Sequence, residues 1–166
     1  MVVTKKYVTQ IVATHLSQNL IQKLTVNDVI ALTTVSRTTF YRNFPNGLQS
    51  LYLDIIDLRL EDIRLCDSWS AALDYLVTTL SEQRLLFLNL FNTAPDTERY
   101  HFFEKKADQF VRHYFGRQYF NKIAPAHLTF FSEALCSQLL NWFLSGMVED
   151  ERQIRQKLDT FYLLKA

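Results

Sequence analysis

Hydrogen-bond donors crowd a short segment that begins at Ser36 and ends before Pro45. Ser36 has a preferred N-cap side chain, and Pro45 disfavours helix at the residue before it, so a helix of about two turns is expected. Phe40 and Phe44 form one apolar stripe along this helix. The other faces carry no carboxylate, and their side chains are Arg37, Thr38, Thr39, Tyr41, Arg42 and Asn43. The helix therefore offers donors and positive charge to a partner.

Another short helix is expected just before it, from Thr25 to about Thr33. Asp28 follows Thr25 by three residues, which is close to the capping-box pattern. Thr34 and Val35 then form a tight turn. Two short helices joined by such a turn, with donors at the leading end of the second, indicate a helix-turn-helix. Its second helix enters the major groove of DNA by that end.

The string VSRTTFYRNF, together with TVNDVI upstream, resembles the DNA-binding signature of TetR/AcrR-type transcriptional regulators. The resemblance covers about residues 5 to 55. It implies an all-α fold, with an N-terminal three-helix helix-turn-helix unit over residues 1–47 and a helical-bundle regulatory and dimerisation domain over residues 48–166. It also implies a homodimer that binds a palindromic operator on double-stranded DNA. Repression, relieved when a small molecule binds the bundle, is the commoner habit of the family.

The resemblance assigns DNA contacts position by position. Base edges fall to Arg37 and Thr38, since arginine can bind guanine through two donors. Tyr41 and Arg42 reach a base or the backbone, and Asn27 touches a base. Phosphate oxygens suit Thr25, Ser36, Thr39 and Asn43. For Thr25 and Ser36, simple helix capping is an equally good interpretation and is compatible with a phosphate contact.

Three departures from the family pattern concern the backbone and the charge of this unit, and the first is Thr33 at the small-residue position before the turn. Thr34 stands where the family usually has glycine, and we expect it to keep ordinary backbone angles. Gly47 stands where a phosphate-binding lysine is common. Losing that lysine removes one released counterion, so we expect binding that is weaker or less dependent on salt.

Composition and charge agree with a basic DNA-binding domain joined to a second domain that does not itself contact DNA. The 166 residues are 48% hydrophobic and 21% charged, with only 3 Gly and 3 Pro, which favours long uninterrupted helices. Residues 1–50 hold five basic side chains and one acidic, whereas the remainder has a net charge of −3. Cys66 and Cys136 are far apart without metal-ligand spacing, so we expect reduced thiols and no metal or other cofactor.

The sequence contains none of the compact motifs of enzymes and no segment suited to a membrane. HExxH, GxSxG and glycine-rich phosphate loops are absent, and Glu149, Asp150 and Glu151 look like a charged helix start. No apolar run approaches the roughly 18 residues that a membrane span requires, and no signal segment precedes the first helix. We therefore expect a cytoplasmic protein that is not an enzyme.

The apolar periodicity predicts helices on either side of the motif. The first runs from Thr4 to about Ser17. A long fourth helix runs without interruption from about Asn46 to Asp67, and by resemblance it is the lever between the two domains. Gly116 is expected to kink one of the later helices. These later helices are expected over residues 70–80, 82–92, 96–120, 125–147 and 151–164.

Aromatic side chains concentrate after residue 85, and the bundle does not need all of them for packing. Some are expected to line a pocket for an apolar or aromatic effector, although core or subunit interface is the commoner place for any one of them. The pocket candidates are Phe87, Phe91, Phe110, His113, Tyr114, Gln138 and Trp142. The last two helices are expected to form a two-fold four-helix interface. Its candidates are Leu128, Phe131, Leu135, Leu139, Phe143, Ile154, Leu158 and Phe161.

Two other functions remain open from the sequence. In the first, the C-terminal domain binds a protein partner instead of a small molecule, because at this length its pocket is small or filled. In the second, the chain is a helical interaction protein that has lost DNA binding, which the departures at Thr34 and Gly47 keep open.

Overall fold

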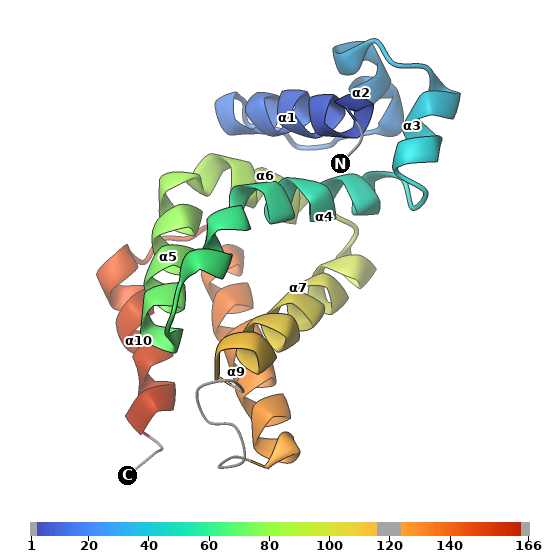
Figure 1. Ribbon diagram of the computed structural model, residues 1–166. Helices are drawn as coiled ribbons and strands as arrows, with labels where there is room; N and C mark the ends of the chain where they lie inside the picture. Colours follow the sequence, from blue (N-terminus) through green and yellow to red (C-terminus); the bar gives the residue numbers. More distant parts are fainter. Residues whose placement is uncertain (1–2, 116–123, 164–166) are drawn as a thin grey trace. The chain divides into compact units, whose positions relative to one another are not determined.

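The computed structural model describes residues 3–115 and 124–163, and all regular structure in these two ranges is helical (Figure 1). The predicted all-α fold is therefore confirmed. The α-helices are α1 (Val3–Gln18), α2 (Val26–Thr33), α3 (Arg37–Asn43), α4 (Leu48–Arg59), α5 (Trp69–Glu82), α6 (Arg84–Thr93), α7 (Asp96–Phe110), α9 (Pro125–Leu144) and α10 (Glu151–Leu163). A 3-10 helix, η1 (Glu61–Leu65), and a π-helix, η2 (Val111–Phe115), complete the set. A membrane-crossing helix is not found among these elements.

The chain folds into two compact units and crosses between them three times. The first unit comprises residues up to 61 together with residues 83–94. The second comprises residues 62–82 and those from 95 onward. The predicted domain boundary after residue 47 therefore lies inside the first unit, which also takes in α4 and α6.

In the first unit, α1 contacts α2, α4 and α6. Its Val8, Val12 and Leu16 recur every four residues and are at most 1% exposed, as an amphipathic helix requires. They share a core with buried side chains of the other helices, which include Val29, Phe40, Phe44, Leu51, Ile55, Leu86 and Leu90. The N-terminal helices thus bury their apolar stripes on one another, as predicted.

A buried amide, Asn89 of α6, joins α6 to the end of α1. Its Nδ2 donates to the carbonyl oxygens of Leu16 at 2.8 Å and Asn19 at 2.6 Å. Its Oδ1 accepts from the backbone N–H of Ile21 at 3.0 Å. The helix C-terminus at α1 leaves carbonyls without intrahelical partners, and Asn89 satisfies that of Leu16, and that of Asn19 just beyond the helix, from a site about 70 residues away in the chain.

The fourth helix is shorter than the sequence predicts. We expected it to continue to Asp67, but α4 ends at Arg59 and the chain passes through the 3-10 helix η1. The carbonyl oxygen of Ile63 in η1 accepts a hydrogen bond from the Tyr114 hydroxyl of η2. This contact between positions far apart in the sequence accompanies the break, so the continuous apolar pattern alone could not predict it.

The second unit packs α5 against α10, and α9 against α7 and α10. Its core includes Leu73, Val77, Leu135, Trp142 and Ile154, which are all at most 2% exposed. Cys136 is also buried there, and burial together with the nearby Glu104 raises its pKa to about 11. The Cys136 thiol is therefore protonated and poorly reactive at neutral pH.

One arginine ties α5 to α10 at the edge of the second unit. Arg155 of α10 donates to Asp74 of α5 at 2.6 Å, to the Ser70 hydroxyl at 2.9 Å and to Asp159 one turn along its own helix. Burial is the largest single effect on the pKa of Arg155 and lowers it, but the hydrogen bonds to the two carboxylates outweigh burial and leave that pKa raised. The guanidinium group therefore holds the two helices in one register.

The ends of two later helices also differ from the prediction. The helix expected over residues 96–120 changes at Phe110 into the π-helix η2, and Gly116 lies outside the described residues. The helix expected to reach Met147 ends at Leu144. Gly146 and Met147 have φ of 75° and 54°, and this left-handed backbone cannot continue a right-handed helix.

Candidate DNA-binding surface

The start of α2 is fixed by a complete capping box. The Thr25 hydroxyl accepts from the Asp28 N–H at 3.2 Å, and the Asp28 carboxylate accepts from the Thr25 N–H at 2.8 Å and the Thr25 hydroxyl at 2.6 Å. The hydrogen bond from the Thr25 hydroxyl lowers the pKa of Asp28 most, and the hydrogen bond from the Thr25 N–H lowers it further. Thr25 therefore caps α2, as its position in the sequence indicated.

The turn after α2 has a backbone that we did not expect. Thr34 has φ 57° and ψ 16°, in the left-handed region, and its N–H donates to the Ile30 carbonyl at 2.8 Å. The expectation of ordinary angles at Thr34 is therefore wrong. A β-branched residue rarely adopts this conformation, whereas glycine adopts it without cost. The conformation closes the helix and sends the chain into α3.

Two phenylalanines hold α3 against the first unit. Phe40 and Phe44 are fully buried, and their ring centroids are 5.1 Å apart. At the N-terminus, the Ser36 hydroxyl accepts from the Thr39 N–H at 3.1 Å and donates to the Thr39 hydroxyl at 2.9 Å. Asn43 donates from Nδ2 to the Thr39 carbonyl at 2.8 Å. Ser36, Thr39 and Asn43 thus have partners within the helix.

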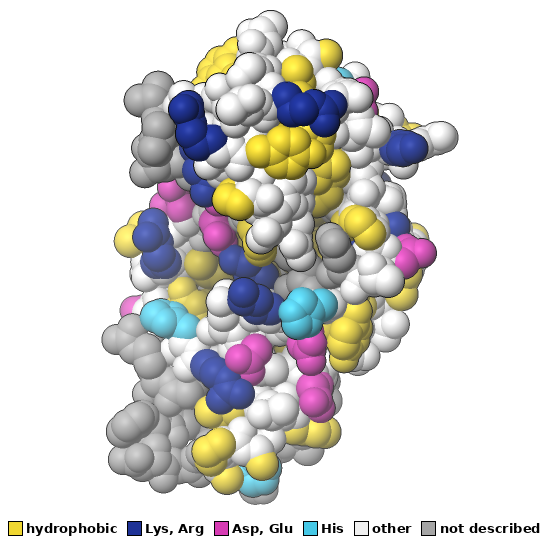
Figure 2. All heavy atoms as spheres, turned by 90° about the vertical axis from the view of Figure 1, so that its right-hand side faces the viewer, with side chains coloured by type: hydrophobic (Ala, Val, Ile, Leu, Met, Phe, Trp, Pro, Cys, Tyr) yellow, Lys and Arg dark blue, Asp and Glu magenta, His cyan; other side chains and the backbone are white. Residues whose placement is uncertain are grey.

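The remaining side chains of α3 point outward. Arg37, Thr38 and Arg42 are exposed, and Tyr41 is 42% exposed with its ring edge against Phe40. In Figure 2 the part of the surface that α3 forms shows basic side chains beside hydrophobic ones. None of the residues of α3 is acidic, so this face can approach phosphates without repulsion.

One contact joins the two helices of the motif at their leading ends. Arg37, the first residue of α3, donates from Nη2 to the Oδ1 atom of Asn27 in α2. Both residues are exposed. The structure therefore brings together two residues that the sequence predicted separately as base contacts.

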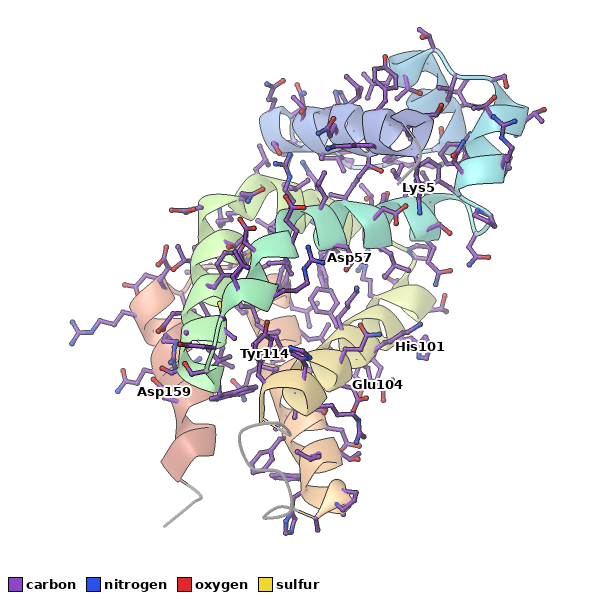
Figure 3. The ribbon with its side chains drawn as sticks, in the orientation of Figure 1. Lys5, Asp57, His101, Glu104, Tyr114 and Asp159 are labelled. Carbon is purple, nitrogen blue, oxygen red and sulfur yellow. The ribbon has the colours of Figure 1, made fainter. Side chains whose placement is uncertain are left out.

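The ammonium group of Lys5 forms an ion pair inside the first unit. Its Nζ lies 2.8 Å from an Asp54 carboxylate oxygen of α4 and 5.8 Å from the centre of the Phe44 ring, and Figure 3 labels Lys5. This ion pair joins α1 to α4 beneath α3. Lys5 therefore links α1 to α4 and lies near Phe44, the residue that ends α3.

Gly47 begins α4 with φ 62° and ψ −133°. This combination is accessible mainly to glycine, so a lysine in its place would strain the backbone. A Cβ atom there would lie 3.9 Å from Tyr41 Cε1, which is ordinary contact. Gly47 thus sets the sharp entry to α4.

Comparison with known proteins shows the family of the chain. A family model described as a transcriptional regulator C-terminal region, TetR_C_8, matches residues 67–162. The chain belongs to the TetR family of transcriptional regulators. The solved structure of a protein named "Dihydroxyacetone kinase operon activator DhaS" is similar, with a TM-score of 0.66 and 16% identity, over 99% of this chain and 97% of that one. At this identity the likeness shows the fold alone, and no curated protein matches the chain.

The predicted effector residues of this TetR-family chain fall in both units. Phe87 and Phe91 are buried on α6 in the first unit, and the other five belong to the second. There Phe110 contacts Trp69 and Tyr114 with ring centroids 5.2 and 5.1 Å apart. His113 is exposed, Gln138 is half-buried and Trp142 donates from Nε1 to the Glu149 carbonyl at 3.0 Å.

The predicted interface residues mostly face the inside of their own chain. Leu135, Leu139, Phe143, Ile154 and Leu158 are at most 7% exposed in the protomer. Leu128 and Phe131 are half-buried, and the side chain of Phe161 lies outside the described residues. A second copy could not reach the five buried side chains without unpacking α9 and α10.

The sequence did not single out two features of this TetR-family chain. Asn89 was missed, although an amide inside the apolar run LLFLNLF was a signal for a buried polar contact. A shallow depression of about 250 Å³ also lies between α7 and α9. It is lined by His101, Glu104, Lys105, Asp108, Thr129, Ser132 and Glu133, and Figure 3 labels His101 and Glu104. Groups of three His, Cys, Asp or Glu side chains that could hold a metal ion are not found where the structure describes the chain.

Proposed function

We propose that this TetR-type regulator is a repressor that binds a palindromic operator as a homodimer and leaves it when a small molecule binds the second unit. One observation carries the proposal: the outward face of α3 is exposed, basic and free of carboxylates, while Phe40 and Phe44 fix the helix from beneath. A rigid donor-bearing helix of this kind suits the major groove.

In this proposal Arg37, Thr38, Tyr41 and Arg42 read bases or contact the backbone from the exposed face. The short side chains of Thr25, Ser36, Thr39 and Asn43 contact phosphates. Thr25, Ser36 and Asn43 already donate to internal partners, so these three groups share their donors with DNA, whereas the Thr39 hydroxyl accepts from Ser36. They therefore contribute less affinity than the exposed guanidinium groups.

We propose that the effector binds at the cluster of aromatic side chains formed by Trp69, Phe110 and Tyr114 in the second unit. Tyr114 lies in the π-helix η2, and π-helical turns often occur at functional sites. Its hydroxyl donates to Ile63 of η1, which follows α4 in the chain. An apolar or aromatic ligand that displaces the Tyr114 ring would break this hydrogen bond.

For the homodimer we propose the outward side of α9 as the interface. Phe130 and Leu144 are 57% and 68% exposed and lie about four turns apart on one side of the helix, with the exposed polar residues Ser137 and Asn141 between them. Val148, just beyond the helix, is 77% exposed. We call Phe130, Ser137 and Leu144 the outer stripe of α9. Exposed apolar side chains arranged in this way are typical of interfaces between subunits.

The proposed DNA contact is tested with duplexes selected from a random pool. A palindromic consensus is expected, because a two-fold dimer reads two equal half-sites. We expect Arg37→Ala to weaken binding to that duplex by about 10- to 100-fold, the range for a lost bidentate base contact. Arg152→Ala removes the same charge from an exposed position on α10 and serves as the control. Unchanged binding by Arg37→Ala would contradict the proposal.

A reporter gene placed under the selected operator determines the sign of regulation. A repressor lowers the reporter's expression, whereas an activator, which is how the structurally similar DhaS protein is named, raises it. Small apolar and aromatic compounds added to the reporter strain then test release.

A further inference from the structure

Asn27 has a contact that a simple DNA-touching residue would not need. Its Oδ1 atom accepts a hydrogen bond from Arg37 Nη2, so the first residue of α3 is held by the second residue of α2. Ten residues separate the two along the chain, and the turn at Thr34 brings them together. We propose that Asn27 is a positioning residue for Arg37, and that it thereby sets the base preference at the operator position that Arg37 reads. This inference rests on the proposed DNA contact of Arg37.

The geometry of the guanidinium group leaves Arg37 able to read a base while it is held. Each terminal nitrogen of arginine carries two N–H groups. The two N–H groups of Nη2 point to different edges of the planar guanidinium group. A hydrogen bond from one N–H of Nη2 to Asn27 uses one edge and leaves the other with its full pair of donors. That free pair is what the O6 and N7 acceptors of guanine require.

The chemistry of the acceptor also matters for a group that must meet DNA. An amide oxygen is neutral, so the Arg37 guanidinium keeps its whole positive charge for the duplex. A carboxylate in the same place would hold the guanidinium more strongly but would neutralise it and repel the phosphates. The Asn27 Nδ2 group remains a donor that can face the DNA backbone at the same time.

Holding Arg37 before DNA arrives lowers the entropy cost of binding. A free arginine side chain at an exposed helix start samples many rotamers, and fixing it on binding costs about 0.5–1.5 kcal/mol, or about 2- to 10-fold in affinity. Because Arg37 is fixed by a hydrogen bond on one side, it also reaches one base pair and not its neighbours. The expected result of losing Asn27 is therefore a modest loss of affinity and a clear loss of preference at one position.

The test compares Asn27→Ala, Asn27→Asp, Arg37→Ala and the double variant on the duplex selected for the wild type and on its single-base variants. Asn27→Ala is expected to lose about 2- to 10-fold in affinity and to flatten the preference at the position that Arg37→Ala flattens. The double variant is expected to bind no more weakly than Arg37→Ala alone. Asn27→Asp keeps the acceptor, so it is expected to bind more weakly than the wild type while it retains the preference at that position.

Other results separate the failure of this inference from that of the proposed function. If Arg37→Ala binds as the wild type does, both the proposed contact and the inference are overturned. If Arg37→Ala weakens binding but the two substitutions are additive, or Asn27→Ala changes a different base or none, Asn27 does not act through Arg37. Gln10→Ala, at an exposed position of α1, is the matched control, and thermal melting verifies that the exposed Asn27 and Arg37 variants remain folded.

Discussion

The turn of the helix-turn-helix holds strain at a single residue. Thr34 adopts a left-handed conformation that its branched side chain disfavours, yet its N–H still closes α2 on Ile30. Its hydroxyl donates to the adjacent Thr33 carbonyl at 2.7 Å, which offsets part of the cost. The direction of α3 therefore depends on one residue whose preferred angles disagree with the turn.

Replacing Thr34 with glycine should relieve this strain. Relief of the left-handed backbone is worth about 1–2 kcal/mol, and the extra freedom of glycine in the unfolded chain removes about 0.5–1 kcal/mol of it. We expect Thr34→Gly to raise the free energy of unfolding by about 0.5–1 kcal/mol in urea denaturation. Ala31→Gly, at an exposed helical position two residues before Thr33, is the control and should lower it. A loss of stability in Thr34→Gly would show that the turn is not strained.

At the scale of elements, α6 is part of the first unit although it lies far in sequence from the other helices of that unit. It packs on α1, and Asn89 supplies three hydrogen bonds to the end of that helix and the loop after it. Tyr52 of α4 and Thr93 of α6 are joined through their hydroxyls at 2.7 Å. Burial raises the pKa of Tyr52, and this hydrogen bond opposes the rise without cancelling it. A helix bonded to both α1 and α4 stiffens the support on which α3 rests.

Removing the Asn89 amide should therefore destabilise the first unit. Asn89→Ala leaves buried carbonyl groups and one N–H without their partner, which costs about 2–3 kcal/mol. Thermal and urea denaturation measure this cost. Asn27→Ala, an exposed asparagine of the same unit, is expected to leave the stability unchanged. Asn89→Asp keeps the acceptor for Ile21 but places a carboxylate beside two carbonyl oxygens, so it should be no more stable than Asn89→Ala.

At the scale of the whole molecule, the two sides of α9 differ in whether a second copy of the chain can contact them. Burial in the protomer withdraws Leu135, Leu139 and Phe143 from any interface, because each already fills the core of the second unit. The outer stripe of α9 leaves its apolar side chains exposed. If the chain pairs through α9, it pairs through this opposite side of the helix.

We expect the protein to be a dimer by sedimentation equilibrium. Leu144→Asp should weaken dimerisation by at least about 10-fold, because the new carboxylate would be buried in the interface without a partner. Leu20→Asp introduces the same charge at an exposed leucine of the first unit, 75% exposed, and should leave the dimer intact. A monomeric wild type, or a Leu144→Asp dimer of unchanged affinity, would exclude this interface.

Much of the helix-turn-helix is encoded in neighbouring residues. Thr25 with Asp28, Ser36 with Thr39, and the spacing of Phe40 and Phe44 act within four residues, so the sequence alone predicts where α2 and α3 begin and which side of α3 is buried. The break of α4 at Arg59 escaped prediction, because the apolar pattern continues past it and the hydrogen bond from Tyr114 comes from about 50 residues away.

Local interactions along the chain were enough to predict the all-α class, the helix-turn-helix and the outward side chains of α3, because capping and helical periodicity act between near neighbours. Packing between distant segments was needed to show that α6 joins the first unit, that Lys5 is paired with Asp54, that Asn27 accepts a hydrogen bond from Arg37 and that the strongest apolar side of α9 is core. An apolar stripe says that a helix side must be covered, and the stripe looks the same whether its own chain or a second copy covers it. Tertiary packing determines which of the two it is, because it places side chains from distant parts of the chain on one stripe and leaves another exposed.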